Sequence, residues 1–228
     1  NRVKELPDFI PELITGSMAS FISNYEITRV GDPIYSYYGY EVEGIFQKGD
    51  DIANSAQPNA KPGDLKFKNQ NDDNAITSDD RVVLGKPFPD VTLGFTNNIR
   101  YKNFNLSIFL QGVFGIQTLD ANVLETFYPT NEYRNRIAKY YQNRWTENNP
   151  TNKYPSGVNS SNYGGQYMTN SLTVKDASFL RIKNINLSYD VPLRGNKYIR
   201  AASVYAAVDN LYTFTGYEGF DPDASASG

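Results

Sequence analysis

The 228-residue sequence contains no cysteine and no histidine. The absence of cysteine excludes disulfide scaffolds, thiolate zinc sites and cysteine nucleophiles, and the absence of histidine removes the commonest metal ligand and general base. Basic residues are not in excess, since the formal net charge is -3, so we expect no nucleic-acid partner. Long apolar runs are also missing. The longest clean run near the C-terminus is Val204–Val208, whereas a membrane-spanning helix needs roughly 20 residues.

Aromatic residues are abundant, with 18 Tyr and 13 Phe, and the clearest pattern lies between Val91 and Phe114. Apolar and polar residues alternate there with a period of two, which is typical of strands with one apolar face. Lys102-Asn103 predicts a two-residue turn in which Asn103 tolerates a positive φ. The resulting hairpin pairs Tyr101 with Phe104, Ile99 with Leu106, Phe95 with Leu110 and Val91 with Phe114.

This register predicts which residues share a face. We expect an apolar face with Val91, Leu93, Phe95, Ile99, Leu106, Ile108 and Leu110. The opposite, polar face is expected to carry Asn98, Arg100, Asn105, Ser107 and Gln111. A soluble sandwich would show the same alternation. Strands of about eleven residues, aromatic residues beside the turn and a long loop over 115–174 instead favour a membrane hairpin with the apolar face toward lipid.

A second hairpin repeats this plan. Its first strand alternates around Ile185, and after a turn through Pro192 and Gly195-Asn196 a second strand is expected over 201–212. The outward residues of that strand are expected to be Ala202, Val204, Ala206 and Val208. Another Tyr-rich strand is expected over 35–47. These make five or six strands, whereas the smallest single-chain membrane barrels have eight, so we expect a piece of a larger protein.

The long loops contain one segment with mostly helical spacing, 131–145. Four aromatic residues and one aliphatic residue form a stripe there, with Arg and Lys between them: Tyr133, Ile137, Tyr140, Tyr141 and Trp145. The plainer interpretation is a short helix that packs this stripe on the base of its own loop. The functional interpretation is that Tyr140, Tyr141 and Trp145 contact a sugar ring or a partner protein.

The segment 69–80 has the spacing of a cation-binding loop. Oxygen ligands for Ca²⁺ are offered, in the manner of a twelve-residue EF-hand loop, by Asn69, Asn71, Asp73, the Ala75 carbonyl, Thr77 through water and Asp80. Position six of the loop is Asn74 where glycine is usual, and Asp80 is shorter than the usual glutamate. We therefore expect a weak, structural calcium site. The alternative is an Asx-rich turn that is stabilised by its own side-chain hydrogen bonds.

Paired carboxylates could in principle serve glycoside hydrolysis. The pairs are Asp72 with Asp73, Asp79 with Asp80, and Glu218 with Asp221. Adjacent carboxylates in Asn-rich loops are usually solvated turn residues, so we expect no enzyme activity and no catalytic residue.

Several motifs resemble those of SusC-like TonB-dependent outer-membrane receptors. They are the stretch Asp209–Asp223 with its Gly-Phe-Asp-Pro-Asp end, Gly31–Tyr40 running on to Phe46, Gly63–Lys68 continuing through Asp79–Arg81, Asp176–Asn184, and Arg144-Trp-Thr-Glu-Asn-Asn-Pro150. The resemblance spans nearly the whole chain. It implies an all-β fold: an antiparallel transmembrane β-barrel segment with long extracellular loops and a short loop helix. Residues 1–228 would be the C-terminal portion of the barrel, without the plug domain and the final strand.

The resemblance also implies a function and partners. Receptors of this family reside in the bacterial outer membrane and import oligosaccharides or peptides. A SusD-like surface lipoprotein caps the barrel, and a TonB complex supplies energy through the N-terminal part that this stretch lacks. The alternative function, from another class, is a soluble, secreted carbohydrate-binding β-sandwich module. Dependence on detergent would distinguish the two.

Overall fold

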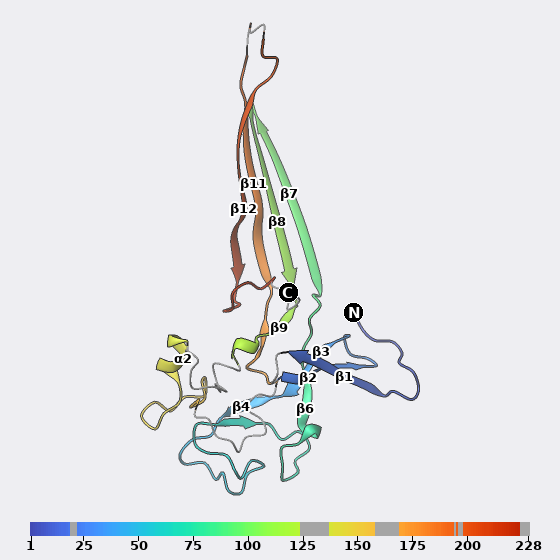
Figure 1. Ribbon diagram of the computed structural model, residues 1–228, viewed down its shortest axis with the longest axis vertical. Helices are drawn as coiled ribbons and strands as arrows, with labels where there is room; N and C mark the ends of the chain where they lie inside the picture. The colour runs from blue at the N-terminus through green and yellow to red at the C-terminus, as the bar shows by residue number, and fades with distance from the viewer. Residues whose placement is uncertain (19–21, 124–136, 158–168, 194, 196–197, 224–228) are drawn as a thin grey trace. The chain divides into compact units, whose positions relative to one another are not determined.

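The computed structural model describes all residues except 19–21, 124–136, 158–168, 194, 196–197 and 224–228 (Figure 1). The chain forms two compact units. Unit 1 comprises residues 1–87 and 117–175, and unit 2 comprises residues 88–116 and 176–228. Antiparallel strands dominate both, and in the described residues they number twelve, more than the sequence predicts. No helix in the described part of the chain has the length and apolar character needed to cross a membrane.

Unit 2 is one antiparallel sheet of four long strands, in the order β12-β11-β8-β7 (Figure 1). The strands are β7 (Val91–Tyr101), β8 (Phe104–Phe114), β11 (Phe179–Asp190) and β12 (Ser203–Thr215). They are 11 to 13 residues long, which is long for a globular protein. We call this sheet the long sheet. The fourth strand begins and ends a few residues later than the expected range of 201–212.

The four residue pairs expected for the first hairpin are confirmed, from Tyr101↔Phe104 to Val91↔Phe114. The positive φ of the turn lies on Lys102, at 53°, and not on Asn103 as expected. Asn103 instead joins the turn to β11. Its carbonyl accepts the Asp190 N–H at 2.8 Å, and its side-chain amide donates to the Asp190 carbonyl at 2.9 Å.

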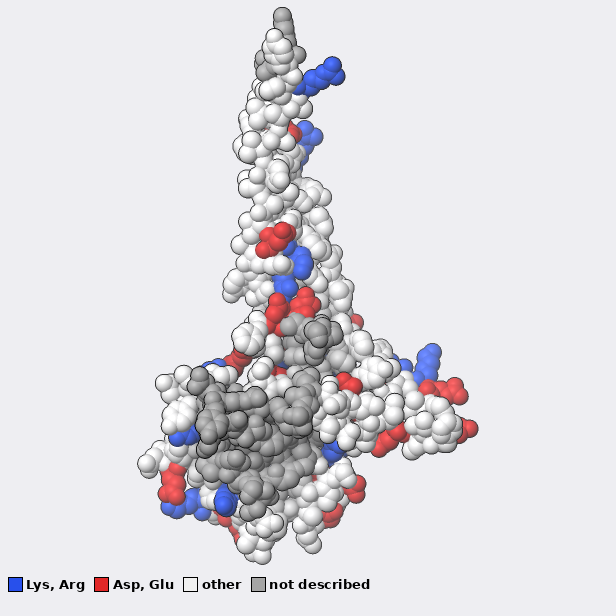
Figure 2. All heavy atoms as spheres, viewed as in Figure 1, with Lys and Arg blue, Asp and Glu red and all other residues white. Residues whose placement is uncertain are grey.

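The long sheet separates apolar from polar residues across all four strands, with exceptions at Asn97 on the apolar face and at Phe109 and Tyr205 on the polar face. Its apolar face carries the expected members of β7 and β8 together with Leu180, Ile182, Ile185, Leu187 and Tyr189 of β11 and Val204, Ala206, Val208, Tyr212 and Phe214 of β12. Many of these side chains are 38 to 67% exposed, which leaves a broad apolar surface open. Charged residues are sparse on the long sheet in the view of Figure 2. The prediction that Val204, Ala206 and Val208 share this face is confirmed.

A β-bulge in β11 keeps this separation intact. Lys183 is the extra residue, because Ile182 pairs with Leu110 of β8 and Asn184 pairs with the next residue, Phe109. A bulge shifts the alternation by one position. Even-numbered Ile182 and odd-numbered Ile185 can therefore lie on the same face. On the partner strand β12, Asn210 adopts a φ of 50° at the same level.

Unit 1 contains three sheets and two short helical segments. One sheet has the order β1-β2-β3-β6, and two further pairs are β4-β5 and β9-β10. The strands are β1 (Glu12–Met18), β2 (Ile22–Arg29), β3 (Ser36–Tyr40), β4 (Val42–Ile45), β5 (Leu65–Phe67), β6 (Arg81–Gly85), β9 (Gln117–Leu119) and β10 (Val174–Asp176). The helical segments are a 3₁₀ turn, η1 (Ser78–Asp80), and the helix α2 (Ala138–Asn143).

The expected single strand over 35–47 is wrong, because the chain changes sheets between β3 and β4. The segment around Asn170 enters at this point: Tyr40 N–H donates to the Thr169 carbonyl at 2.9 Å, and Ser171 N–H donates to the Tyr40 carbonyl at 3.0 Å. Gly39 allows this approach, since a Cβ at that position would lie 2.0 Å from the Thr169 carbonyl oxygen. A contact from 130 residues along the chain therefore ends the strand.

The larger core of unit 1 is aromatic. It consists of Tyr40, Ile45, Leu65, Phe67, Tyr140 and Trp145. The rings of Tyr40 and Phe67 are 5.3 Å apart. Gly63, with a φ of 97°, lies against Trp145, and a Cβ there would come within 2.6 Å of the indole. The core thus joins strands from the first third of the chain to the helix of the long loop.

Candidate functional site

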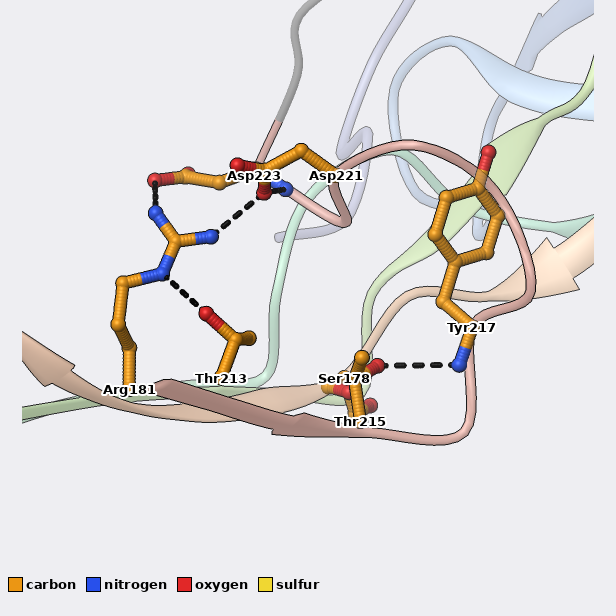
Figure 3. A network of polar contacts seen from close by, with 7 residues as sticks. All are labelled: Ser178, Arg181, Thr213, Thr215, Tyr217, Asp221 and Asp223. Atoms are coloured by element: carbon orange, nitrogen blue, oxygen red, sulfur yellow. Dashed lines mark hydrogen bonds and ion pairs between the residues drawn. The ribbon is translucent and has the colours of Figure 1, made fainter. Parts of the chain in front are cut away.

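The densest polar network of the long sheet surrounds Arg181, at the end opposite the Lys102-Asn103 turn (Figure 3). Arg181 lies on the polar face, and its side chain is only 6% exposed. Its Nε donates to the Thr213 hydroxyl at 2.8 Å, across the β11–β12 pair. Its two terminal nitrogens form ion pairs with Asp221 at 2.5 Å and with Asp223 at 3.3 Å. The guanidinium also lies over the Phe179 ring, 4.9 Å from its centroid.

The carboxylates come from the segment Gly216–Asp223, which follows β12 and which we call the strap. The strap starts at a fixed point, because Tyr217 N–H donates to the Thr215 hydroxyl at 3.0 Å and that hydroxyl donates to the Ser178 carbonyl at 2.8 Å. It then turns back toward Arg181 (Figure 3). Asp223 N–H donates to Asp221 Oδ1 at 2.9 Å across Pro222. The Gly-Phe-Asp-Pro-Asp end therefore supplies a tight turn as well as two charges.

The environment of Asp221 favours its ionised form. The Asp223 N–H has the largest effect and lowers the pKa of Asp221 from its ordinary value of 3.8. Burial opposes this shift, and the Arg181 guanidinium lowers the pKa further. Lys183 adds to this effect. Hydrogen bonds and cations that favour a carboxylate lower its pKa in this way. Both aspartates remain about half exposed, whereas the arginine is buried.

The predicted cation loop is closed by its own hydrogen bonds. Asp80 is fully buried, and its two oxygens accept the Gln70 and Thr77 N–H groups, each at 2.7 Å. Asp73 accepts from Ala75 N–H at 2.8 Å and from the Asn71 side-chain amide at 2.9 Å.

These contacts engage the carboxylates that were predicted as ligands. Asn69 donates its amide to the Asp73 carbonyl, while its buried Oδ1 has no hydrogen-bond partner among the described residues. Within the described ranges, no group of three or more acidic side chains lies close enough to hold a metal ion. Calcium binding by this loop stays a prediction.

The three aromatic residues that were predicted to contact a substrate or partner lie in two environments. Tyr140 and Trp145 are in the core of unit 1, 3% and 8% exposed. Their polar atoms are also engaged, Tyr140 with the Pro155 carbonyl and Trp145 Nε1 with Gln47 Oε1, both at 2.8 Å. Tyr141 is 51% exposed, and the Arg144 guanidinium stacks on its ring at 3.9 Å.

The helix that carries these residues begins later than expected, at Ala138. The positions of Asn131 and Tyr133 fall within 124–136, outside the described residues. Because α2 is only six residues long, Tyr140 and Trp145 are held by tertiary contacts with the core of unit 1. The packing interpretation therefore applies to Tyr140 and Trp145, and only Tyr141 is exposed enough for the functional one.

Comparison with known proteins shows which family the chain belongs to. No family model matches the chain. TonB-dependent receptor P3 of Formosa agariphila is 31% identical over 231 residues, which cover 99% of this chain and 22% of that receptor. TonB-dependent receptor SusC of Bacteroides thetaiotaomicron is 28% identical over 171 residues, which cover 74% of this chain and 16% of SusC. The chain belongs to the SusC-like TonB-dependent receptors.

Solved structures show a similar fold. The structure of the RagAB peptide transporter superposes with a TM-score of 0.73 at 24% sequence identity, over 98% of this chain and 23% of that chain. The RagAB peptide importer in its open-open state gives a TM-score of 0.72. The SusC-like chain described here spans about a fifth of the length of its curated relatives. TonB-dependent receptors of this kind are outer-membrane proteins, and their fold is a β-barrel.

The motifs that carry the family resemblance hold the fold together. In the Arg144–Pro150 motif, Trp145 fills the core and Asn149 donates its side-chain amide to the Arg144 carbonyl at 3.0 Å. In the Gly63–Lys68 motif, Asp64 is buried and accepts Lys61 N–H at 2.6 Å.

The sequence motifs located these segments but did not identify Arg181 as the centre of a polar network. The available signal was a lone arginine in a strand and two aspartates in the Gly-Phe-Asp-Pro-Asp motif. Their separation of 40 and 42 residues in sequence concealed the pairing.

Proposed function

We propose that this chain forms part of the barrel wall and outer loops of a receptor that imports a nutrient across the outer membrane by TonB-dependent active transport. The supporting observation is the continuous separation of faces on the long sheet. The apolar face, open over four strands, suits lipid, and the polar face with Asn98, Arg100 and Arg181 suits a water-filled lumen. The family supports the same conclusion.

The hydrogen bonds of the polar face fit a wall that faces water. Asn184 donates to Asp209 at 2.7 Å, and Asn105 donates to Asp190 at 3.2 Å, in both cases between neighbouring strands. Side chains that bond across strands hold the register without needing apolar cover. A wall of this kind can stay wet on one side while the other side is in lipid.

The rest of the mechanism is proposed for the whole receptor, of which this chain is a part. A SusD-like surface lipoprotein would deliver an oligosaccharide or a peptide to the outer mouth, and the TonB complex would act through a part of the receptor outside these 228 residues. RagAB is a peptide transporter, which makes peptides a cargo to test beside oligosaccharides.

Uptake by cells tests this function. A strain that lacks the full-length receptor would be supplied with fluorescently labelled mixtures of oligosaccharides and of peptides, with and without a protonophore. We expect loss of uptake of one mixture in the deletion strain, recovery on complementation, and loss again when the protonophore removes the energy source. Uptake that is unchanged by deletion, or a receptor that is soluble without detergent, would refute the proposal. The soluble carbohydrate-binding β-sandwich would then be the better interpretation.

A further inference from the structure

We propose that Arg181, Asp221 and Asp223 form an electrostatic lock, with Arg181 as the positioning residue, that fastens the strap over the end of the long sheet's polar face. All three residues and the strap belong to unit 2. The lock joins parts of the chain that are 40 and 42 residues apart. Its geometry is shown in Figure 3.

Burial makes this network different from an ordinary surface ion pair. Exposed pairs contribute little, because water screens both charges. Here the arginine side chain is 6% exposed, and removing the partner of a buried charge is strongly destabilising because the charge is left uncompensated. The strap supplies both carboxylate partners that the described residues offer to Arg181. If the strap left this position, the described residues would leave the guanidinium its bond to Thr213 and its contact with the Phe179 ring, and no carboxylate.

The sheet side of the lock is rigid. Arg181 and Thr213 are directly paired in the β11–β12 ladder, so the Nε contact fixes the direction of the guanidinium. The ring of Phe179, 2% exposed, lies beneath it. Cation–aromatic contacts of this kind are strengthened when the cation is desolvated. Arg181 is therefore oriented before the strap meets it.

The strap side is shaped to reach the guanidinium and still expose an aromatic residue. The Tyr217 ring folds onto Gly219, where a Cβ would come within 2.3 Å of it. Between this contact and the two aspartates lies Phe220, which is 100% exposed. The lock thus holds the backbone on both sides of Phe220 and presents its ring to the surroundings at a defined place.

Spin-label mobility at Phe220→Cys, in an otherwise cysteine-free full-length receptor, tests the lock. We expect an immobile label in the parent protein and a mobile one in Asp221→Asn, with roughly a tenfold rise in the mobile fraction for the loss of one charged hydrogen bond. Asp223→Asn, which loses the longer contact, should have a smaller effect. Arg100→Gln is the matched control, because Arg100 lies on the same face near the opposite end.

Acid titration of spin-label mobility distinguishes an ion pair from simple packing, because packing alone would not depend on pH. The pKa of Asp221 is lowered in the folded protein, first by the Asp223 N–H within the strap and also by Arg181. The part due to Arg181 holds the strap above the ordinary value of 3.8 and is lost as pH falls through the lower, folded value. The charged groups around it are Arg181, Lys183 and Asp223. The parent protein should release the strap below pH 3.8, and the Asp221→Asn/Asp223→Asn double variant should show no such step.

Two results would overturn the lock. One is an immobile label in both Asp221→Asn and the double variant at neutral pH, and the other is an acid step that survives in the double variant. Both aspartates are half exposed, so these variants should fold even if Arg181 variants do not. Under the proposed function the lock holds the strap at one mouth of the lumen. Mobility is measured without transport, so failure of the lock and failure of the import proposal are distinguishable.

Discussion

Individual aromatic residues in one short segment have opposite surroundings. Trp145 fills the core beside Gly63, whereas Tyr141 stacks with Arg144 at the surface. Sequence spacing predicted a shared stripe because these residues recur at helical intervals. The helix is too short to define a face by itself, so contacts with β4 and β5 decide which rings are buried.

Replacement of Trp145 by alanine should destabilise unit 1 by about 3 to 5 kcal/mol, the usual cost of deleting a buried large aromatic side chain. Tyr141→Ala, on the exposed side of the same helix, should change the free energy of unfolding by less than about 0.5 kcal/mol. Denaturant unfolding of the receptor in detergent, with proteolysis of the loops as the readout, measures the free energy of unfolding of both variants. Equal losses in the two variants would contradict this division. If Tyr141 contacts cargo or a partner, its variant should lose binding while keeping stability.

The cation loop provides a second prediction for single residues. If calcium binds at 69–80, millimolar calcium should slow proteolysis of this loop, since extracellular calcium modules bind in that range. Asp73→Ala should abolish the calcium effect, and Asp72→Asn should keep it, because asparagine tolerates the φ of 56° at that position. If the loop resists proteolysis equally in calcium and in chelator, its own hydrogen bonds, and not calcium, keep it ordered.

At the scale of elements, the β7–β8 hairpin follows directly from local rules. A two-residue turn leaves one register, and a period of two then assigns every side chain to a face. The β11–β12 hairpin could be predicted only in part. The bulge at Lys183 changes the alternation, and it shifts the register of β11 against both of its neighbours, β8 and β12.

The apolar face gives a prediction for this element. Phe95→Arg should destabilise the folded, membrane-inserted receptor by roughly 2 to 4 kcal/mol if Phe95 lies near the bilayer midplane. Thr96→Arg is the matched control, since Thr96 is the next residue and faces the polar side. Folding into lipid vesicles across a urea series measures the difference. If both variants behaved alike, the apolar face would not be in lipid.

For the whole molecule, the order of strands and loops predicts sidedness. The Lys102-Asn103 turn, the last residue of β11 and the first residue of β12 lie at one end of the long sheet, since Asp190 bonds Asn103 and pairs with Ser203. The strap, Ile116 and Ala177 lie at the other end, where Ala177 N–H donates to the Ile116 carbonyl at 3.0 Å. Short turns on the periplasmic side and long loops outside are the usual arrangement of outer-membrane barrels.

Labelling of single cysteines tests this orientation in intact cells, and the absence of native cysteine from this stretch makes each label specific there. A membrane-impermeant maleimide should label Phe220→Cys and Asp79→Cys from outside. Lys102→Cys should react only after the outer membrane is permeabilised. Labelling of Lys102→Cys from outside, together with the loop positions, would contradict the proposed order of strands.

The sequence by itself determined the features that depend on neighbouring residues: the alternation of β7 and β8, their turn and register, the two faces, and the motifs of the SusC-like family. Tertiary structure alone decided where β3 ends, which rings form the core, how the bulge at Lys183 restores the faces, and which charges Arg181 meets. Each of these depends on contacts between residues dozens of positions apart. A local pattern carries no information about such a partner, because burial and ion pairing gain their free energy only when the folded chain brings the two groups together.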